Sequence, residues 1–462
     1  MRNYELKYDI AVIGAGPAGL SAAITAARAG KKVILLEKNG YLGGNATLGL
    51  PLLGFLDLDG RKIVGGIAQE YVTRLQERGQ AFGHRVCPKH NSVSNISPEG
   101  FKTLAIEMCK EAGVDVILHL EASKVDREDN KITAVHLYGK GNEVVVTADL
   151  YIDCTGDGDV AYLADCSFES GQPGTGVLQP PTVMFTLENV DTNRLFDHIE
   201  AHPDEMTYSA SIDHRPGYDA DYFRASDNHV FVGLRQTFLR MREQGKCPVD
   251  RETLIYIKSV NPGEVYVNTT RLLNVDATNI FDLTRAELEG QLQIPKLVEM
   301  LRESVPGFEN AFVATIMPTL GVRETRRFKG IKCLVEEDLL EGKIPEDSIA
   351  LGAYKIDIHS GKDRSTLFKT VKKPFGIPYG ILVSAEYDNL MFAGRCASMD
   401  AVALSSARVM PQCMSMGQAA GEAAAMALDA GIAPKDVDVK ALQNELLKTG
   451  AIFKEEQIDV NY

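Results

Sequence analysis

Short apolar runs and alanine-rich stretches alternate at the start of the chain. Residues 8–13 and 32–37 are apolar runs, and residues 18–29 between them have helical composition and end at Gly30. Runs of this length next to glycine are typical of buried strands, whereas the alanine-rich stretch favours a helix. The pattern predicts a β-α-β unit with parallel strands, because a helical crossover joins them.

Helical periodicity returns further along the chain. We expect four more helices, over residues 66–78, 98–112, 283–304 and 411–430. Ser97 precedes the second as an N-cap and Gly113 follows it. Pro411 suits the first turn of the last helix, and Gly431 ends that helix.

Strand-like alternation dominates two other regions. Residues 114–120, 131–138 and 143–152 predict an antiparallel meander, and residues 389–394 predict a buried strand. Between about 168 and 370 the chain is more polar and lacks the β-α-β rhythm. That middle segment therefore predicts an inserted α+β domain.

Composition limits the classes of protein. The chain has 462 residues, 45% of them hydrophobic and 24% charged, and a formal net charge of −14. These values are typical of a globular protein, and an acidic surface argues against nucleic acid as a partner. Residues 10–27 carry no charge, but several glycines and the flanking Asp9 and Arg28 make a buried strand and helix a better interpretation than a membrane span.

The eight cysteines lie apart, with no C-x-x-C pair. This spacing gives no support to an iron–sulfur cluster, a zinc ribbon or any other metal site. We expect reduced thiols in a soluble, cytoplasmic protein.

A glycine fingerprint stands between the first strand and the first helix. Gly14 permits a tight turn, Gly16 lets a pyrophosphate approach the backbone, and Gly19 lets the helix pack closely on the strand. Glu37, at the end of the second strand, can accept hydrogen bonds from a ribose diol. Together they predict a dinucleotide site at the helix N-terminus.

Two further glycine turns follow strands, at residues 153–159 and 393–396, and a glycine pair, Gly43 and Gly44, follows Glu37. A cofactor that several separated turns contact is long and buried, which favours FAD. An NAD-binding protein without flavin stays open as an alternative. No second G-x-G-x-x-G after a strand supports a separate pyridine-nucleotide domain.

The chain resembles the FAD-dependent oxidoreductases of the glutathione-reductase-like (GR2) fold, in the branch that includes fumarate reductase flavoproteins. The matching stretches are residues 42–49, 152–159, 321–327, 377–379, 388–396 and 408–421. The resemblance implies an α/β fold with a Rossmann-like FAD-binding domain, in which a parallel sheet is joined to an antiparallel β-meander. That discontinuous domain would comprise residues 1–167 and 371–462, and residues 168–370 would form an inserted α+β substrate or cap domain.

The resemblance also implies the residues that hold FAD. They are Gly14, Gly16, Pro17, Ala18, Gly19, Glu37, Lys38, Gly43, Gly44, Asn45, Ala46, Ala122, Thr155, Gly156, Asp157, Gly394, Arg395 and Gln418. The helix that follows Pro411 has two compatible interpretations. Its N-terminal dipole can stabilise charge on a reduced flavin, or the helix can pack in the core through Gly417 and Gly421.

Four side chains are candidates for substrate chemistry. Arg323 and Arg326, with Arg327 beside them, suit a carboxylate or another anionic oxygen, although surface ion pairs explain such arginines equally well. His359 can act as a general acid or base, or can be structural. Tyr379 can place a hydroxyl near the flavin.

The sequence therefore predicts an oxidoreductase that exchanges a hydride between flavin N5 and a small, polar, oxygen-bearing substrate. The alternatives are a fumarate-reductase-like ene reductase of an α,β-unsaturated acid, and a flavin-binding subunit that works only in a larger complex. The expected partners are the substrate and an electron donor or acceptor, with no nucleic acid and no membrane, and a homo-oligomer is compatible with the sequence.

Overall fold

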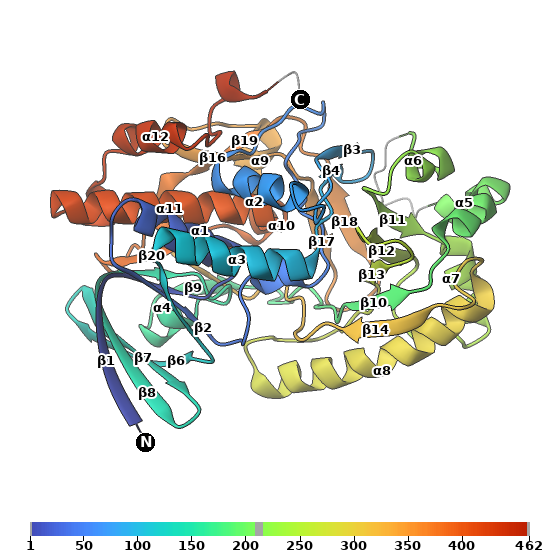
Figure 1. The fold of residues 1–462 in the computed structure, drawn as a ribbon, viewed down its shortest axis with the longest axis horizontal. Helices are drawn as coiled ribbons and strands as arrows, with labels where there is room; N and C mark the ends of the chain where they lie inside the picture. Colours follow the sequence, from blue (N-terminus) through green and yellow to red (C-terminus); the bar gives the residue numbers. More distant parts are fainter. Residues whose placement is uncertain (1, 208–215, 460–462) are drawn as a thin grey trace.

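The computed structural model describes residues 2–207 and 216–459. Figure 1 shows two lobes side by side, one built around a seven-stranded sheet and one around a five-stranded sheet. The first lobe contains both ends of the described chain. Segments from the two ends of the sequence therefore share one lobe.

The seven-stranded sheet has the order β5-β2-β1-β8-β7-β6, and β20 pairs with β8 on a separate edge. Its strands are β1 (Arg2–Ile13), β2 (Val33–Glu37), β5 (Asp115–Leu118), β6 (Glu121–Glu128), β7 (Lys131–Gly139), β8 (Asn142–Asp153) and β20 (Leu390–Phe392). Ile10 pairs in parallel with Val33 of β2 and with Leu150 of β8. The predicted parallel β-α-β unit is confirmed, and β20 brings the predicted C-terminal strand into the same sheet.

The predicted meander was wrong in its first strand. Residues 115–118 form β5, which pairs in parallel with β2, and the first strand of the meander is β6, which the pattern did not predict. β6 is an edge strand of sequence EASKVDRE with one buried side chain, Val125. An edge strand with so little apolar surface carries no alternating signal.

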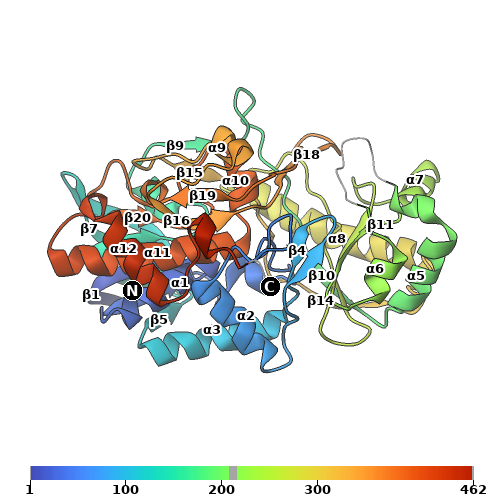
Figure 2. The same ribbon diagram turned by 90° about the horizontal axis from the view of Figure 1, so that it is seen from above.

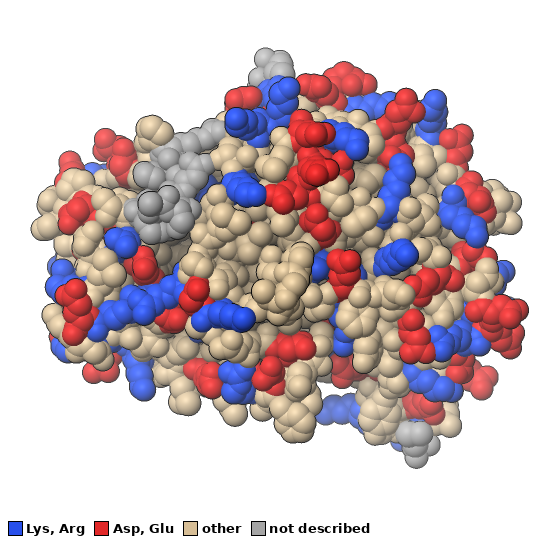
Figure 3. All heavy atoms as spheres, turned by 180° about the vertical axis from the view of Figure 1, so that it is seen from behind, with Lys and Arg blue, Asp and Glu red and all other residues tan. Residues whose placement is uncertain are grey.

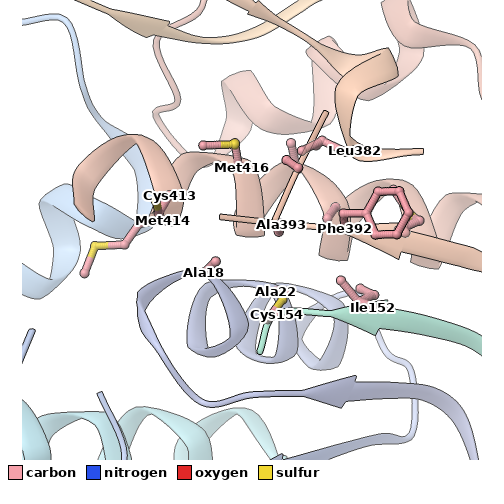
Figure 4. Close-up of a cluster of buried hydrophobic side chains, with 14 of the residues drawn as sticks. Ala18, Ala22, Ile152, Cys154, Leu382, Phe392, Ala393, Cys413, Met414 and Met416 are labelled. Atoms are coloured by element: carbon pink, nitrogen blue, oxygen red, sulfur yellow. The ribbon is translucent and has the colours of Figure 1, made fainter. Parts of the chain in front are cut away.

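Helices α1 (Pro17–Arg28) and α11 (Met410–Ala430) pack against each other beside this sheet, as Figures 1 and 4 show. A Cβ added at Gly417 would lie 2.0 Å from the carbonyl oxygen of Ala18, and one at Gly421 would lie 2.3 Å from that of Ala22. Only glycine therefore permits this approach of the two backbones. The packing interpretation of α11 is confirmed.

Three other predicted helices are present, with small shifts at their ends. They are α2 (Gly66–Gln76), α3 (Pro98–Ala112) and α8 (Ile280–Ser304). The Oγ of Ser97 accepts a hydrogen bond from the amide of Gly100, as an N-cap does. α8 begins three residues before the prediction because the side chain of Asn279 caps it.

The second lobe is an antiparallel sheet covered by helices. Its strands, in the order β11-β12-β13-β10-β14, are β10 (Phe185–Glu188), β11 (Val230–Gly233), β12 (Leu254–Lys258), β13 (Val265–Val267) and β14 (Phe312–Ile316). Figure 2 shows α5 (Thr192–Ala201), α6 (Ala220–Arg224) and α7 (Arg235–Glu243) gathered at the far end of this lobe, with α8 running along it.

The remaining elements are short. They are α4 (Asp159–Leu163), α9 (Glu336–Glu341), α10 (Ala401–Ala407), α12 (Val439–Lys448), β3 (Arg85–Cys87), β4 (Asn91–Val93), β9 (Phe168–Ser170), β15 (Arg326–Phe328), β16 (Ser348–Gly352), β17 (Ile356–His359), β18 (Thr366–Lys369) and β19 (Phe375–Pro378).

Each lobe has its own hydrophobic core. The first core takes residues from the N-terminal part, from residues 328–383 and from the C-terminal part, whereas most of the second lies between Val183 and Leu320. Residues 328–370, which the sequence division places in the cap domain, thus contribute to the first core. The division at residues 168 and 370 stays a prediction.

The surface is mixed in charge. Figure 3 shows lysine and arginine side chains interspersed with aspartate and glutamate over one whole face. Among the described residues, none of the helices combines the length and the apolar character that crossing a membrane requires.

Candidate functional site

A cavity of about 400 Å³ lies where the chain leaves β1, β2 and β8, and we call it the first cavity. These three strands are parallel at this end, so their carboxyl ends meet at one edge of the sheet. That edge is where ligands bind in open α/β sheets. The turn after β20 reaches the same edge and adds Gly394 and Arg395.

The three fingerprint glycines have distinct roles in this wall. Gly14 has φ +97°, and a Cβ there would lie 2.4 Å from the carbonyl oxygen of Cys154. A Cβ at Gly19 would lie 1.8 Å from the carbonyl oxygen of Gly14. Gly16 lies in the cavity wall, and a Cβ there would meet no protein atom within 4 Å. Gly14 and Gly19 therefore shape the turn, whereas Gly16 leaves its backbone open to a ligand.

Glu37 and Lys38 follow β2 into the first cavity. The Glu37 carboxylate accepts hydrogen bonds from the amides of Ala15 and Asn39, both at 2.8 Å. Burial lowers the pKa of Lys38, but nearby carboxylates, Asp157 first among them, outweigh burial and raise that pKa. Lys38 therefore carries a positive charge beside the glycine turn.

The turn after β8 is fixed by a buried carboxylate. Asp153 accepts hydrogen bonds from the amide and hydroxyl of Thr155 and from the amide of Ala161. The next acid, Asp157, accepts from the Thr325 hydroxyl at 2.7 Å and from Arg395 at 3.1 Å. These contacts join the β8 turn to the C-terminal turn, so both face one cavity.

Most residues that the resemblance assigned to FAD line this cavity. They are Gly14, Gly16, Pro17, Ala18, Glu37, Lys38, Gly44, Asn45, Ala122, Thr155, Gly156, Asp157, Gly394 and Arg395. The other four lie behind the wall. Gly19 and Ala46 are buried, Gly43 takes φ +114° against Thr47 and Phe101, and Gln418 bonds the amide of Ile67 and the hydroxyl of Thr449.

A second cavity, of about 250 Å³, adjoins the first. Both have five wall residues in common, namely Asn45, Val322, Arg395, Arg408 and Met410. Met410 is the first residue of α11, so the N-terminus of that helix lies where the cavities meet. The first cavity suits a dinucleotide, and the second can hold another molecule beside one end of it.

Two of the four predicted catalytic side chains, Arg323 and His359, line the second cavity. Arg323 donates to the carbonyl of Pro180 and to the Thr182 hydroxyl. Burial, followed by the like charge of Arg408, lowers the pKa of Arg323 to about 9. An anion beside Arg323 would stabilise its positive charge and so raise this pKa again.

His359 faces partners within the protein through both ring nitrogens. Its Nε2 lies 3.2 Å from an oxygen of Asp357, and its Nδ1 lies 3.2 Å from the Thr366 hydroxyl oxygen. Burial lowers the pKa of His359 to about 3, against the opposing effect of Asp357, so the ring is neutral at physiological pH. Burial raises the pKa of Asp357, but His359 and other nearby basic groups outweigh burial and hold that pKa well below its usual value.

Arg326 and Tyr379 line neither cavity. The guanidinium of Arg326 pairs with Asp159 at 3.1 Å and lies 3.9 Å from the ring centroid of Tyr162. The Tyr379 hydroxyl donates to the carbonyl of Pro434 at 2.8 Å and is buried. These contacts favour structural roles for both side chains.

The second cavity also contains charged residues that sequence reasoning did not select. They are Lys89, Arg251, Lys355, Asp357 and Arg408. No motif surrounds Arg251 or Lys355. Arg408 lies in residues 408–421, one of the stretches that carry the family resemblance. For this residue, that position is the one feature of the sequence that could have indicated a role in the site.

The first cavity fits a long dinucleotide such as FAD. Gly16 leaves room at the backbone for a pyrophosphate, and helix α1 begins directly after it. Arg395 keeps one buried guanidinium nitrogen, Nη1, without a hydrogen-bond partner within the described part of the chain. Over residues 2–207 and 216–459, no group of histidine, cysteine, aspartate or glutamate side chains could hold a metal ion.

Comparisons with known proteins agree with this geometry. The family model described as FAD dependent oxidoreductase matches residues 9–446. Digeranylgeranylglycerophospholipid reductase 1 of Methanococcoides burtonii is 26% identical over 172 residues, which is 32% of this chain and 38% of that protein. Urocanate reductase of Eggerthella lenta is 60% identical over 40 residues, 9% of this chain and 7% of that protein. The chain thus spans well under half the length of these curated relatives.

Among solved structures, a geranylgeranyl bacteriochlorophyll reductase-like protein of Thermoplasma acidophilum is 12% identical and has a TM-score of 0.47. That alignment covers 97% of this chain and 85% of the other.

Proposed function

Because the chain belongs to the family of FAD-dependent oxidoreductases, we propose that it transfers a hydride between FAD and a small, oxygen-bearing substrate in the second cavity. The chain is an oxidoreductase, and FAD is its cofactor. When bound, FAD supplies the hydride chemistry at its N5 atom. The protein supplies binding, orientation and charge.

The observation that carries the proposal is the junction of the cavities at the N-terminus of α11. The glycine turns and Glu37 would hold the cofactor along the first cavity. Its redox-active end would then lie at the junction, where Arg408 and Met410 contribute to both walls. A positive helix terminus at that place favours negative charge on a neighbouring group.

The chain's own residues would position the substrate in the second cavity. Arg323 can bind an anionic oxygen, and the neutral His359 can hold Asp357 in place through Nε2. Val322 and Met410 contribute apolar side chains to the junction, beside the polar Asn45, Arg395 and Arg408. Such positioning, rather than a strong acid or base, is what these residues can supply.

The experiment is anaerobic mixing of the FAD-loaded enzyme with panels of hydroxy acids, sugars, steroids and enoates. Oxidisable substrates should bleach the oxidised-flavin absorbance, and reducible ones should restore it in enzyme reduced beforehand. An enzyme whose flavin responds to none of these classes in either direction would contradict the proposal.

An ene reductase acting on an α,β-unsaturated acid is the second candidate. It is favoured by Arg323, which lies in the second cavity with no carboxylate partner among the described residues. Arg323→Ala should then abolish turnover of enoates and leave FAD content unchanged. Retained enoate turnover in that variant would exclude this candidate.

A further inference from the structure

One wall of the second cavity is an apolar sheet face. Strands β11 and β12 pair there, and Val230, Val232, Ile255 and Ile257 line the cavity. Side chains alternate between the two faces of a strand. The cavity wall is therefore one complete face of this strand pair.

The opposite face of the same strands is already packed. Phe231 and Tyr256 stack with ring centroids 5.0 Å apart and are fully buried. On the cavity side, Leu50, Leu53 and Met184 extend the apolar wall. Val230, Val232 and Ile257 are already buried by the chain, whereas Ile255 is partly exposed, so a ligand can cover the remaining apolar surface there.

Another part of the second cavity is strongly basic. Six lysine and arginine side chains and one carboxylate, that of Asp357, contribute to its walls. Arg251, Arg323 and Arg408 donate to neutral oxygens of the protein, such as the carbonyls of Thr270, Pro180 and Arg323, respectively. None of these three arginines has a carboxylate within 4.0 Å in the described part of the chain.

Arg251 is the clearest sign of a missing anion. The residue is 6% exposed, and its Nη2 has no hydrogen-bond partner among the described residues. Burial and the charges of Arg323 and Arg271 lower its pKa well below the usual value. Buried charges in proteins are paired, so an anionic ligand group would complete this cluster.

We propose that the substrate is an amphiphilic carboxylic acid. Its carboxylate binds Arg251, Arg323 and Arg408, and its apolar body lies on the sheet face formed by Val232 and Ile255. This inference rests on the proposed function, which places the substrate in the second cavity. It adds that the substrate is polar at one end only.

Binding of simple probes to the FAD-loaded protein tests the inference without turnover. Acetate, butanoate, octanoate, octan-1-ol and octyl phosphate are titrated by calorimetry at constant ionic strength. From butanoate to octanoate, affinity should rise about fourfold per methylene. Octan-1-ol should bind at least tenfold more weakly than octanoate, because it lacks the charge. Octanoate no tighter than acetate, or octan-1-ol equal to octanoate, would overturn the inference, and tighter binding of octyl phosphate would overturn the carboxylate assignment.

Three variants separate the two ends of the ligand. Arg251→Met should weaken the binding of octanoate at least tenfold and leave the binding of octan-1-ol unchanged. Arg251→Lys should retain most of the octanoate affinity. Ile255→Thr should reduce the gain per methylene without affecting acetate. Arg194→Met is the control, because Arg194 is exposed and pairs with Glu309 away from both cavities. FAD content reports whether each variant is folded, and octanoate binding equal to the parent in folded Arg251→Met would overturn the inference.

The two proposals can fail separately. A flavin that no substrate bleaches or reoxidises would refute the proposed function, while the probe affinities stand. Turnover of neutral substrates combined with no binding of octanoate would refute the substrate class and leave the redox function intact.

Discussion

Replacing Gly16 by alanine should weaken FAD binding without harming the fold. Gly16 has φ −74° and ψ −174°, values that alanine adopts without strain. Among the described glycines, it alone combines a negative φ with no atom within 4 Å of an added Cβ. The new methyl group would project into the first cavity, at the place where the pyrophosphate should approach the backbone.

Gly16→Ala should have opposite effects on the stability of the apoprotein and on its affinity for FAD. Without cofactor, Gly16→Ala should stabilise the protein by about 0.4–1 kcal/mol, because alanine restricts the unfolded chain. Displacing the pyrophosphate from one backbone amide removes a charge-assisted hydrogen bond of about 1.5–3 kcal/mol. FAD affinity should therefore fall about 10- to 150-fold.

Two other glycines provide matched controls. Gly30→Ala places a Cβ in open space at φ +85° at the far end of α1, so it should cost about 1–2 kcal/mol of stability and leave FAD affinity unchanged. Gly14→Ala places a Cβ on a residue at φ +97°, and that Cβ would lie only 2.4 Å from the carbonyl oxygen of Cys154. It should therefore destabilise the apoprotein by more than Gly30→Ala does.

The assay uses FAD fluorescence, which titrations with apoprotein should quench. Apoprotein stability comes from denaturant midpoints. The reasoning fails if folded Gly16→Ala binds FAD as tightly as the parent does.

Three further substitutions test the roles of side chains outside the cavities. Arg326→Met should lower the free energy of unfolding by about 2–3 kcal/mol, since it breaks the ion pair with Asp159, and should leave the substrate KM unchanged. A raised KM at normal stability would show instead that Arg326 contacts the substrate. Tyr379→Phe should lower the free energy of unfolding by about 1 kcal/mol, because the hydrogen bond to the Pro434 carbonyl is lost, and should keep kcat at the parent value. A large drop in kcat would show instead that Tyr379 is catalytic. Burial lowers the pKa of His84 to about 3, so below pH 6.5 the unfolded chain takes up a proton that native His84 does not. Between pH 6 and pH 4 this group should therefore lower the free energy of unfolding by about 1.4 kcal/mol for each pH unit. In His84→Gln, the free energy of unfolding obtained from denaturant midpoints should lack this part of the pH dependence. An equal pH dependence in the variant and the parent would refute the prediction.

The dinucleotide site was predictable because its signal is local. Gly14, Gly16 and Gly19 stand within six residues, between a strand and a helix that have clear apolar patterns. Each glycine answers a steric requirement that a single turn imposes. The C-terminal glycine turn was also predictable as a cofactor contact, because it follows a buried strand. The pairing of β20 with β8 that brings it to this site is a long-range contact, which local pattern does not encode.

The substrate cavity was less accessible to sequence reasoning. Arg323 and Arg326 are three residues apart, yet one lines the second cavity and the other pairs with Asp159 behind the wall. Arg323 precedes β15 and Arg326 begins it, so sequence proximity alone does not give the directions of their side chains. Arg251 stands in a segment without any motif, and only the sheet and the burial around it reveal its role.

The contact between α1 and α11 also determines when the protein can become active during synthesis. The two helices come from opposite ends of the chain, and the tight approach at Gly417 and Gly421 requires both. Residues 29–409 are synthesised between the two helices, so the first β-α-β unit must wait for its partner. FAD capture is consequently a late step, and a nascent chain that stops before residue 410 should exit as an apoprotein with the apolar face of α1 exposed.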